Sequence, residues 1–423
     1  MGVGEPGLGL GVPEELRTYA WLNGASLAMK TRPRVAVVGA GVGGLTLAAA
    51  LTRIGVPCLV FEQARSLTEV GAGVQLSPNA IRPLVQLGIG PALRRHAVRI
   101  TATEVRSWQD QPITRTTLGD DCERRFAAPY YAMHRAHLQG ALSEAVGEAP
   151  LRLGHQVTGV EEQGAGARVV FADGLTQDAD LVVGADGIRS VARTVLASDT
   201  LVFSGFGAFR GLVPTTRLPA AAREPVVRLW TGPAGHVVCY PVAGGELVSF
   251  AAIVPLADPP AGSAADPAVL RAAFKGWGGL VPHLIDAADR VGIWALYDRE
   301  PLQRWATDRI TVLGDAAHPM LPFLAQGANQ AVEDAMDLAA CLVTCDGDVP
   351  AALTRYAALR APRTTALQQY ARFAAPHLAG GADQRDRDSA LQSASSLNGR
   401  AWLYDYRAGV VDDYRAGVVS APA

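Results

Sequence analysis

The sequence predicts an α/β fold in which a parallel sheet is interrupted by a mainly antiparallel β-rich insert and is followed by C-terminal helices. Three observations support this prediction. Short apolar runs at 35–38, 58–61, 180–183 and 309–313 have the form of strands that are buried on both faces. Helical segments rich in Ala and Leu separate or follow these runs. Between residues 201 and 300, β-rich runs alternate with Pro and Gly, which is typical of an antiparallel sheet.

The parallel part opens with a strand, a helix and a second strand. After the run at 35–38, residues 45–54 have a helical pattern, and this helix is expected to end near Gly55 and Pro57. The strand at 58–61 follows directly, so the whole segment is predicted to be a βαβ unit. The other expected elements are helices over 131–148 and 328–345 and strands near 157–160, 168–171, 226–230, 236–241, 247–254 and 291–297.

Length, charge and cysteine content limit what the chain can be. Its 423 residues, of which 49% are hydrophobic, suit two closely packed domains. The formal net charge of −2 gives no reason to expect nucleic acid, and no apolar stretch reaches the roughly 20 residues that cross a bilayer. Five scattered cysteines without a CxxC pair argue against a metal site and favour a reducing cytoplasm. We expect a cytoplasmic monomer or homodimer.

A glycine-rich turn joins the first strand to the first helix. Its sequence over 39–44, GAGVGG, fits the G-x-G-x-x-G dinucleotide fingerprint, and Glu62 closes the next strand. Gly39 permits the tight turn, Gly41 lets backbone approach a pyrophosphate, and Gly44 lets the helix pack on the strand. The helix N-terminus offers N–H groups to phosphates, and Glu62 is expected to bind ribose hydroxyls. The alternative is a tight turn alone, and the fingerprint leaves open which dinucleotide binds.

Two further segments carry a resemblance to a known family. Residues 184–190 (GADGIRS) and 314–319 (GDAAHP) resemble the "DG" and "GD" segments of class A flavoprotein monooxygenases. Together with the fingerprint, and supported by 71–80 and 133–135, they resemble the para-hydroxybenzoate hydroxylase family over about residues 33–375. Within the family, these segments most resemble those of salicylate, 3-hydroxybenzoate and 6-hydroxynicotinate hydroxylases.

This resemblance implies FAD as the bound cofactor and NADH or NADPH as the reductant. It places Asp315 on the ribityl hydroxyls, Arg135 at the linking phosphates, and Asp186 near both FAD and the docking nicotinamide. Arg189, in the same segment, is a further expected cofactor contact. Gln63, beside Glu62, and Val74, in the supporting segment, complete the expected FAD contacts. Each position also has a plainer interpretation. Asp315 is also a reasonable helix N-cap, and Asp186 with Arg189 also fits an ordinary turn with a surface charge.

The start of the helix at 328–345 carries the most mechanistic prediction. A reduced flavin is anionic around its pyrimidine edge, and free N–H groups at a helix N-terminus stabilise such charge. The resemblance puts Gly327, Ala328 and Asn329 at that edge. His318, in the GD segment, is interpreted as a packing and hydrogen-bonding residue rather than a catalyst.

The β-rich insert divides the predicted FAD-binding domain into two parts, and the expected domain boundaries follow from this. A flexible extension is predicted over 1–31, a Rossmann-like FAD-binding domain over 32–200 and 300–380, a β-rich substrate domain over 201–299, and a helical or irregular tail over 381–423. Near the C-terminus, the segment at 406–411 recurs at 414–419; we assign no function to this duplication.

The chain lacks the sequence signatures of an acid–base or metal enzyme, with no GxSxG, no HExxH and no Cys/His cluster. A cofactor is therefore expected to carry the difficult step. In the family, reduced flavin and dioxygen form a C4a-hydroperoxide whose distal oxygen attacks an electron-rich ring. The resemblance thus implies hydroxylation of an aromatic or heteroaromatic substrate that is phenolic or carboxylated.

The substrate is expected between the β-rich domain and the flavin. Arg210 lies on a strand that resembles the substrate-facing strand of the family, so it is a candidate partner for a substrate carboxylate or hydroxyl. Pro322 is expected on the flavin side. His236 and Tyr240, four apart on a strand, point to one face and are candidate partners for a phenol. Arg210 has the alternatives of a structural ion pair or a flavin contact, and the other two have that of sheet packing. Relatives often carry Trp or His where this chain has Phe209, which leaves the particular substrate open.

Two other functions compete with hydroxylation. The first keeps FAD without oxygen insertion, as in a dehydrogenase, an oxidase or a prenyl-chain reductase. The second is a non-enzymatic nucleotide-binding or redox-sensing module.

Overall fold

A computed structural model describes residues 22, 29–67, 73–147, 150–233, 235–260, 265–378 and 396–410. Its parallel sheet has five strands in the order β18-β12-β1-β2-β8, and every neighbouring pair is parallel. The strands are β1 (Val35–Val38), β2 (Cys58–Glu62), β8 (Leu151–Leu153), β12 (Leu181–Gly184) and β18 (Ile310–Val312). The four strands that the apolar runs predicted are therefore neighbours in one sheet, with β1 near its centre, and this order is that of a Rossmann-like fold.

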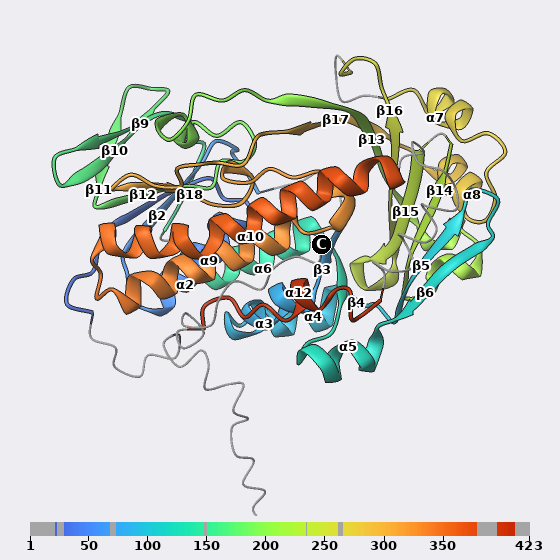
Figure 1. Cartoon of the computed structure of the whole chain (residues 1–423), viewed down its shortest axis with the longest axis horizontal. Coiled ribbons are helices and arrows are strands. Elements are labelled where there is room, and N and C mark those ends of the chain that lie inside the picture. Colours follow the sequence, from blue (N-terminus) through green and yellow to red (C-terminus); the bar gives the residue numbers. More distant parts are fainter. Residues whose placement is uncertain are drawn as a thin grey trace, which may run out of the picture.

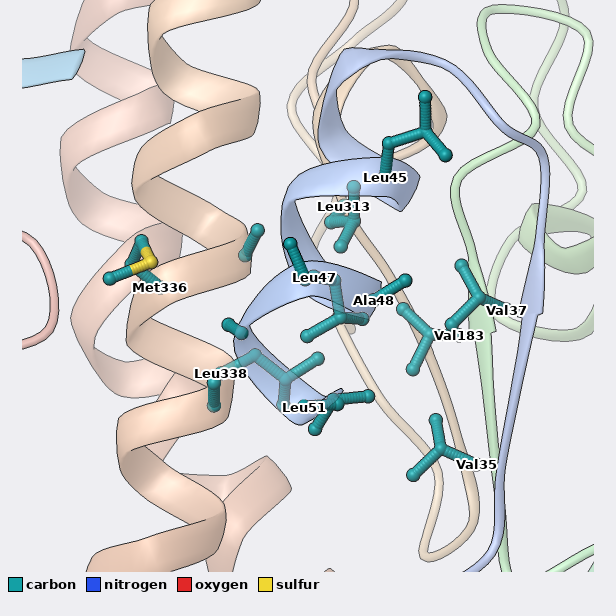
Figure 2. Packing of buried hydrophobic residues seen from close by; sticks show 14 of the residues in the cluster. Val35, Val37, Leu45, Leu47, Ala48, Leu51, Val183, Leu313, Met336 and Leu338 are labelled. Carbon is teal, nitrogen blue, oxygen red and sulfur yellow. The ribbon is translucent and has the colours of Figure 1, made fainter. Parts of the chain in front are cut away.

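Long helices cover this sheet (Figure 1). They are α2 (Val42–Arg53), α6 (Arg135–Val146), α9 (Gly327–Thr344) and α10 (Val349–Leu378). Figure 2 shows the side chains of Leu47 and Leu51 on α2 between Val35 of the sheet and Leu338 of α9. All four of these side chains are almost fully buried, and burial of this kind contributes about 1.5–3 kcal/mol for each large aliphatic side chain. The core thus fixes both helices against the strands that precede the glycine-rich turn and the GD segment.

The β-rich part forms a seven-stranded sheet in the order β17-β13-β16-β15-β14-β5-β6. Its strands are β5 (Ala102–Ser107), β6 (Pro112–Thr117), β13 (Val202–Pro214), β14 (Val226–Gly232), β15 (Gly235–Val242), β16 (Leu247–Pro255) and β17 (Gly292–Asp298). Only the pairing of β14 with β5 is parallel within the sheet. The expected mainly antiparallel sheet is confirmed, and it also takes in β5 and β6, which come from before the insert.

Smaller elements complete the fold. A second antiparallel sheet contains β9 (Val157–Gln163), β10 (Gly166–Phe171) and β11 (Thr176–Ala179), and a third contains β3 (Gly73–Leu76), β4 (Val98–Arg99) and β7 (Tyr131–His134). The short helices are α3 (Pro78–Gln86), α4 (Gly90–His96), α5 (Gly119–Phe126), α7 (Pro267–Ala273), α8 (Val281–Ala287) and α12 (Ala401–Tyr404).

One expected helix was wrong at its start. Residues 131–134 form strand β7, because they pair with all four residues of β3, and the helix begins only at Arg135. Strand β3 also meets the seven-stranded sheet. The Gly73 N–H donates to Ser249 Oγ at 3.1 Å, and a Cβ on Gly73 would lie 2.6 Å from a ring carbon of Tyr240. This close approach joins the two parts of the molecule beside the site.

Parts of the predicted organisation lie outside the described residues. These are most of the extension at 1–31, much of the tail at 381–423, and the second copy of the C-terminal duplication. Across the described segments, no helix is long and apolar enough to cross a membrane. The same segments hold no group of three or more His, Cys, Asp or Glu side chains arranged to bind a metal ion.

Candidate active site

A cavity of about 710 Å³ opens where the parallel strands end. It is lined by the last residues of β1 and β2 and by residues directly after β12 and β18, which is the edge where open α/β sheets bind ligands. Most of the predicted site residues meet there: Gly39, Gly41, Glu62, Gln63, Val74, Arg135, Asp186, Arg189, Arg210, Asp315, Pro322, Gly327 and Ala328. Residues that lie far apart in the sequence are therefore brought to one surface.

The three fingerprint glycines have three different environments. Gly39 has a φ of +104°, and a Cβ there would lie 2.4 Å from the carbonyl oxygen of Ala185. At Gly44 a Cβ would lie 2.0 Å from the carbonyl oxygen of Gly39, so the helix can pack this closely only without a side chain. At Gly41 a Cβ would meet no atom within 4 Å. The space beside Gly41 is therefore cavity, as the approach of a pyrophosphate requires.

Glu62 ties the glycine-rich turn to strand β2. Its Oε2 accepts the Ala40 N–H and its Oε1 accepts the Ala64 N–H, both at 2.9 Å. Each carboxylate oxygen has further acceptor capacity, so these bonds orient the group and leave it able to accept ribose hydroxyls. Gln63 lies next to it, exposed at the edge of the cavity.

The DG turn is organised by the side chain of Asp186. Its Oδ1 accepts the Ser190 hydroxyl at 2.5 Å, and its Oδ2 accepts the Val191 N–H at 2.7 Å. Burial raises the pKa of this carboxyl, while the same hydrogen bonds oppose that rise. The turn interpretation thus describes what the carboxylate does here, although Asp186 also lines the cavity. Arg189 is exposed at the cavity edge.

Asp315 presents its carboxylate to the cavity. The side chain is exposed to that space, and its Oδ1 is 3.7 Å from the point where a Cβ on Gly327 would lie. Burial by the surrounding protein raises its pKa, while His318, Arg135 and Arg210 act in the opposite direction. Within the described part of the chain it accepts no hydrogen bond, so it does not serve as the helix cap of the alternative interpretation. An orphan acceptor of this kind fits a ligand that carries hydroxyl groups.

Helix α9 begins at the cavity wall. Gly327 and Ala328 line the cavity, and their N–H groups belong to the first turn, where no carbonyl of the same helix can accept them. Ala325, just before the helix, has a φ of +52° and a ψ of 36°, a left-handed conformation that is uncommon outside glycine. The helix therefore directs its positive end into the cavity.

The side chain of Asn329 does not face the cavity, where a residue at the start of the helix was expected to contact the flavin edge. Its Nδ2 donates to the carbonyl oxygens of Gln75 at 3.0 Å and Ala325 at 2.8 Å, and its Oδ1 accepts the Ser77 N–H at 2.9 Å. The side chain is fully buried and joins α9 to β3. Asn329 does not line the cavity.

A buried ionic network lies under the GD segment and was not foreseen from the sequence. Asp334 accepts the Gly314 N–H at 2.8 Å and bonds His318 Nε2 at 2.5 Å through one oxygen, and its other oxygen accepts Arg360 Nε at 2.7 Å. Glu333 is bound by Arg360 and Arg363. The charged residues within the otherwise apolar helix 328–345 were the available signal. The structural interpretation of His318 is confirmed.

Arg210 lies in the cavity without a carboxylate partner among the described residues. Its guanidinium carbon is 5.7 Å from the ring centroid of Trp294, within range of a cation–π contact. Burial lowers its pKa, Tyr240 and Asp315 act to raise it, and Arg135 acts to lower it. No ion pair of Arg210 is found among the described residues, and its charged neighbours in the cavity are Arg135 and Asp315.

His236 and Tyr240 lie behind the cavity wall rather than on it. Both are buried, and Tyr240 packs against Gly73, which does line the cavity. Burial raises the pKa of Tyr240, while Arg210, Ser249 and Gln75 act to lower it. The ring of His236 is 5.5 Å from that of Phe323, and its Nδ1 has no partner among the described atoms. Burial lowers the pKa of His236 to about 4.

Comparison with known proteins identifies the family. A family profile described as an FAD binding domain matches residues 32–371. The chain belongs to this family. It is 45% identical over 386 residues to a 3-amino-4-hydroxybenzoate 2-monooxygenase of Streptomyces platensis, covering 90% of this chain and 98% of that protein. It is 35% identical over 352 residues to a 6-hydroxynicotinate 3-monooxygenase of Pseudomonas fluorescens, covering 81% and 91%.

A solved structure shares the fold. The substrate complex of a salicylate hydroxylase superposes on this chain with a TM-score of 0.77 and 28% sequence identity. The match covers 93% of this chain and 99% of that one. The sequence-based identification of an FAD-dependent aromatic monooxygenase that uses NAD(P)H is confirmed. A dehydrogenase, an oxidase, a prenyl-chain reductase and a redox sensor find no support in these relatives.

The residues of the cavity fit FAD. Gly41 leaves open the space that a pyrophosphate requires, and Glu62 retains acceptor capacity at the end of β2. Asp315 offers a carboxylate that accepts no hydrogen bond from any described residue. The first turn of α9 supplies N–H groups at the same cavity. Because these features all line one cavity, they suit a long ligand that carries a ribose toward one end, phosphates in the middle and a polar ring at the other end.

Proposed function

We propose that this FAD-dependent monooxygenase hydroxylates 3-amino-4-hydroxybenzoate or a closely related amino-hydroxybenzoic acid. The observation that carries the proposal is the 45% identity to a monooxygenase of that substrate over 98% of its length. In the balanced reaction, the ring exchanges one hydrogen for a hydroxyl group. NAD(P)H and one proton supply the reducing equivalents, and the second oxygen atom of dioxygen leaves as water.

The chain's own residues would bind and orient the cofactor. We assign the glycine-rich turn and Arg135 to the phosphates, Glu62 to the ribose, and Asp315 to the ribityl hydroxyls. The first turn of α9 would stabilise negative charge at the flavin edge. When bound, FAD supplies electron transfer from the nicotinamide and the activation of dioxygen.

The remaining residues would prepare the ring and exclude water. Val74, Met320 and Pro322 give the cavity an apolar side, and a dry site protects reactive oxygen species from side reactions. Burial lowers the pKa of His236 to about 4 and so favours the neutral ring, whose unprotonated nitrogen can accept a hydrogen bond from a phenolic hydroxyl that reaches it. We therefore retain His236 and Tyr240 as the proposed partners of the phenol, and their present burial requires that the substrate enter from the side of Gly73 or Phe323.

The direct test is an assay of the purified protein with FAD and dioxygen. NADH or NADPH oxidation would be followed with and without 3-amino-4-hydroxybenzoate, and the product would be identified by mass spectrometry and NMR. The expected result is faster NAD(P)H oxidation and a product with one additional oxygen, at ring carbon 2. Rapid oxidation that yields only hydrogen peroxide with this acid, and with related amino- and hydroxybenzoic acids, would contradict the proposal.

We also infer that the enzyme works in a reducing compartment such as the cytoplasm. All five cysteines lie in described segments and none forms a disulfide, as is usual where thiols are kept reduced. The assignment of residues 201–299 to substrate binding and of 32–200 with 300–380 to FAD binding remains part of this proposal, as does a monomeric or homodimeric state.

A further inference from the structure

A second pocket of about 200 Å³ lies beside the FAD cavity. Strands β5, β14 and β15 form one wall, the end of α10 and the segment at 399–404 form another, and Phe323 to Ala325 closes it toward the cavity. Its lining includes Gln75, Tyr130, Val238, Arg400 and Tyr404. No residue predicted from the sequence to act in catalysis or cofactor binding lies in this pocket.

Arg400 is the distinctive residue of the pocket, because it is a cation with no anionic partner in the part of the chain that the structure describes. Its Nη1 donates to the Tyr404 hydroxyl at 3.2 Å, and among the described residues no carboxylate pairs with it. Burial opposes its charge, yet the hydroxyls of Tyr404 and Tyr130 raise the pKa of Arg400. A partly buried guanidinium has five N–H donors, and leaving such donors without an acceptor is unfavourable. The site therefore has unused capacity to bind an anion.

The rest of the pocket suits an aromatic ring. Its walls are mainly apolar and aromatic, including Val238, Leu324 and the rings of Tyr130 and Tyr404, whose centroids are 6.0 Å apart. An apolar cavity of about 150 Å³ is large enough to hold benzene, so about 200 Å³ accommodates a substituted ring. A ring together with an anion that matches the planar fork of arginine describes an aromatic carboxylate.

The pocket and the FAD cavity share a thin wall. Ala325 lines both spaces. On strand β3, Val74 lines the cavity while the adjacent Gln75 lines the pocket, since neighbouring residues of a strand point to opposite sides. Gln75 Oε1 accepts the Tyr130 hydroxyl at 2.9 Å. The wall between the two spaces is therefore formed in part by β3 and Ala325.

We propose that this pocket binds the carboxylated ring of the aromatic substrate and that Arg400 holds its carboxylate. Arg210 lines the FAD cavity near Arg135 and Asp315, so in this proposal it contacts the cofactor rather than the substrate carboxylate. The identity of the acid rests on the proposed function, whereas the preference for a carboxylate rests on the pocket. Arg400 is thus a determinant of substrate specificity contributed by the C-terminal segment.

The test compares binding of benzoate to the FAD-loaded wild type and to the Arg400→Gln and Arg400→Lys variants. Binding would be measured by calorimetry, with FAD content and melting temperature recorded for every variant. We expect the dissociation constant for benzoate to rise at least about tenfold in Arg400→Gln, as for loss of a charge-assisted pair, and to rise less in Arg400→Lys. Binding of 2-aminophenol, which lacks a carboxylate, is expected to change less than about twofold.

The matched control is Arg125→Gln. Arg125 bonds Asn398 of the same C-terminal segment but lies at the surface, so its loss is expected to leave benzoate binding unchanged. If Arg400→Gln does not fold, Arg400→Lys and Tyr404→Phe test the proposal in its place. The first removes the planar guanidinium and the second removes the hydroxyl that Arg400 bonds, so both are expected to weaken benzoate binding. Equal benzoate affinity in the folded Arg400 variants, or its loss in Arg210→Gln instead, would overturn the proposal.

The two proposals fail in distinguishable ways. If the wild type binds benzoate through Arg400 but does not hydroxylate 3-amino-4-hydroxybenzoate, only the identity of the substrate is wrong. If it hydroxylates that acid with the same KM in wild type and Arg400→Gln, the carboxylate anchor is wrong. With the anchor in place, KM for the acid is expected to rise at least about tenfold in Arg400→Gln while kcat changes much less.

Discussion

Asp334 on α9 accepts the backbone N–H of Gly314 at 2.8 Å, and this bond joins the helix to the loop that carries Asp315. The same carboxylate binds His318 and Arg360. Although burial acts to raise its pKa, the pKa is lowered to about 2 because His318, Arg360 and the Gly314 N–H together outweigh that effect. The helix whose N-terminus lines the cavity and the loop beside it are therefore held as one unit.

The first prediction concerns this joint. Asp334→Asn leaves Arg360 with one fewer carboxylate in a fully buried site, and removing one partner of a buried pair typically costs about 3–5 kcal/mol. We expect a large decrease in the free energy of unfolding by urea and weaker FAD binding. Asp178→Asn, which breaks an exposed pair with Arg168, is the control and should cost less than about 1 kcal/mol. Similar losses in the two variants would contradict the role given to the buried pair.

The second prediction separates two glycines of the same turn. Gly41→Ala should fold normally, since a Cβ there meets no protein atom, but should weaken FAD binding because the methyl group occupies cavity space. Gly44→Ala should fail to fold or melt far lower, because its Cβ would lie 2.0 Å from the Gly39 carbonyl oxygen. Thermal melting of the FAD-free proteins and FAD titration measure the two effects. If Gly41→Ala retained wild-type FAD affinity, the pyrophosphate would not lie beside it.

The third prediction uses the pH dependence of stability. The pKa of His236 is lowered to about 4 in the folded protein, against about 6.5 for an unperturbed histidine. Between these values the unfolded chain takes up a proton that the folded chain does not, so stability decreases as the pH falls from about 6.5 to about 4. Over that range His236→Gln should show a shallower decrease in urea unfolding free energy than the wild type. Parallel curves for the two proteins would show that His236 is not held neutral.

The sequence predicted the parallel sheet and the FAD cavity because their signals are local. Val35–Val38 is an unbroken apolar run before a glycine-rich turn, and the two segments that contain Asp186 and Asp315 each follow another such run. The start of the helix expected at 131 was misassigned because the pairing of Tyr131–His134 with β3 depends on residues far away in the chain.

Other features of the site depend on contacts that no local pattern records. The pairing of Arg360 with Glu333 joins two helices through a fully buried ion pair, and nothing in either segment alone indicates it. Arg400 was not singled out either, because one arginine in a C-terminal segment has no pattern of its own. Its significance comes from Tyr130, which lies 270 positions earlier in the chain and lines the same pocket.

The affinity of Asp315→Ala for FAD tests most directly whether the flavin's sugar chain lies against that carboxylate. Asp315 is open to the cavity and hydrogen-bonded to no other described residue, so its removal should disturb the fold little while removing an acceptor for the ribityl hydroxyls. We predict an unchanged fold by circular dichroism and an FAD dissociation constant raised at least about tenfold, as for loss of a hydrogen bond to a charged group. A yellow variant with wild-type FAD affinity and turnover would contradict this placement of the cofactor.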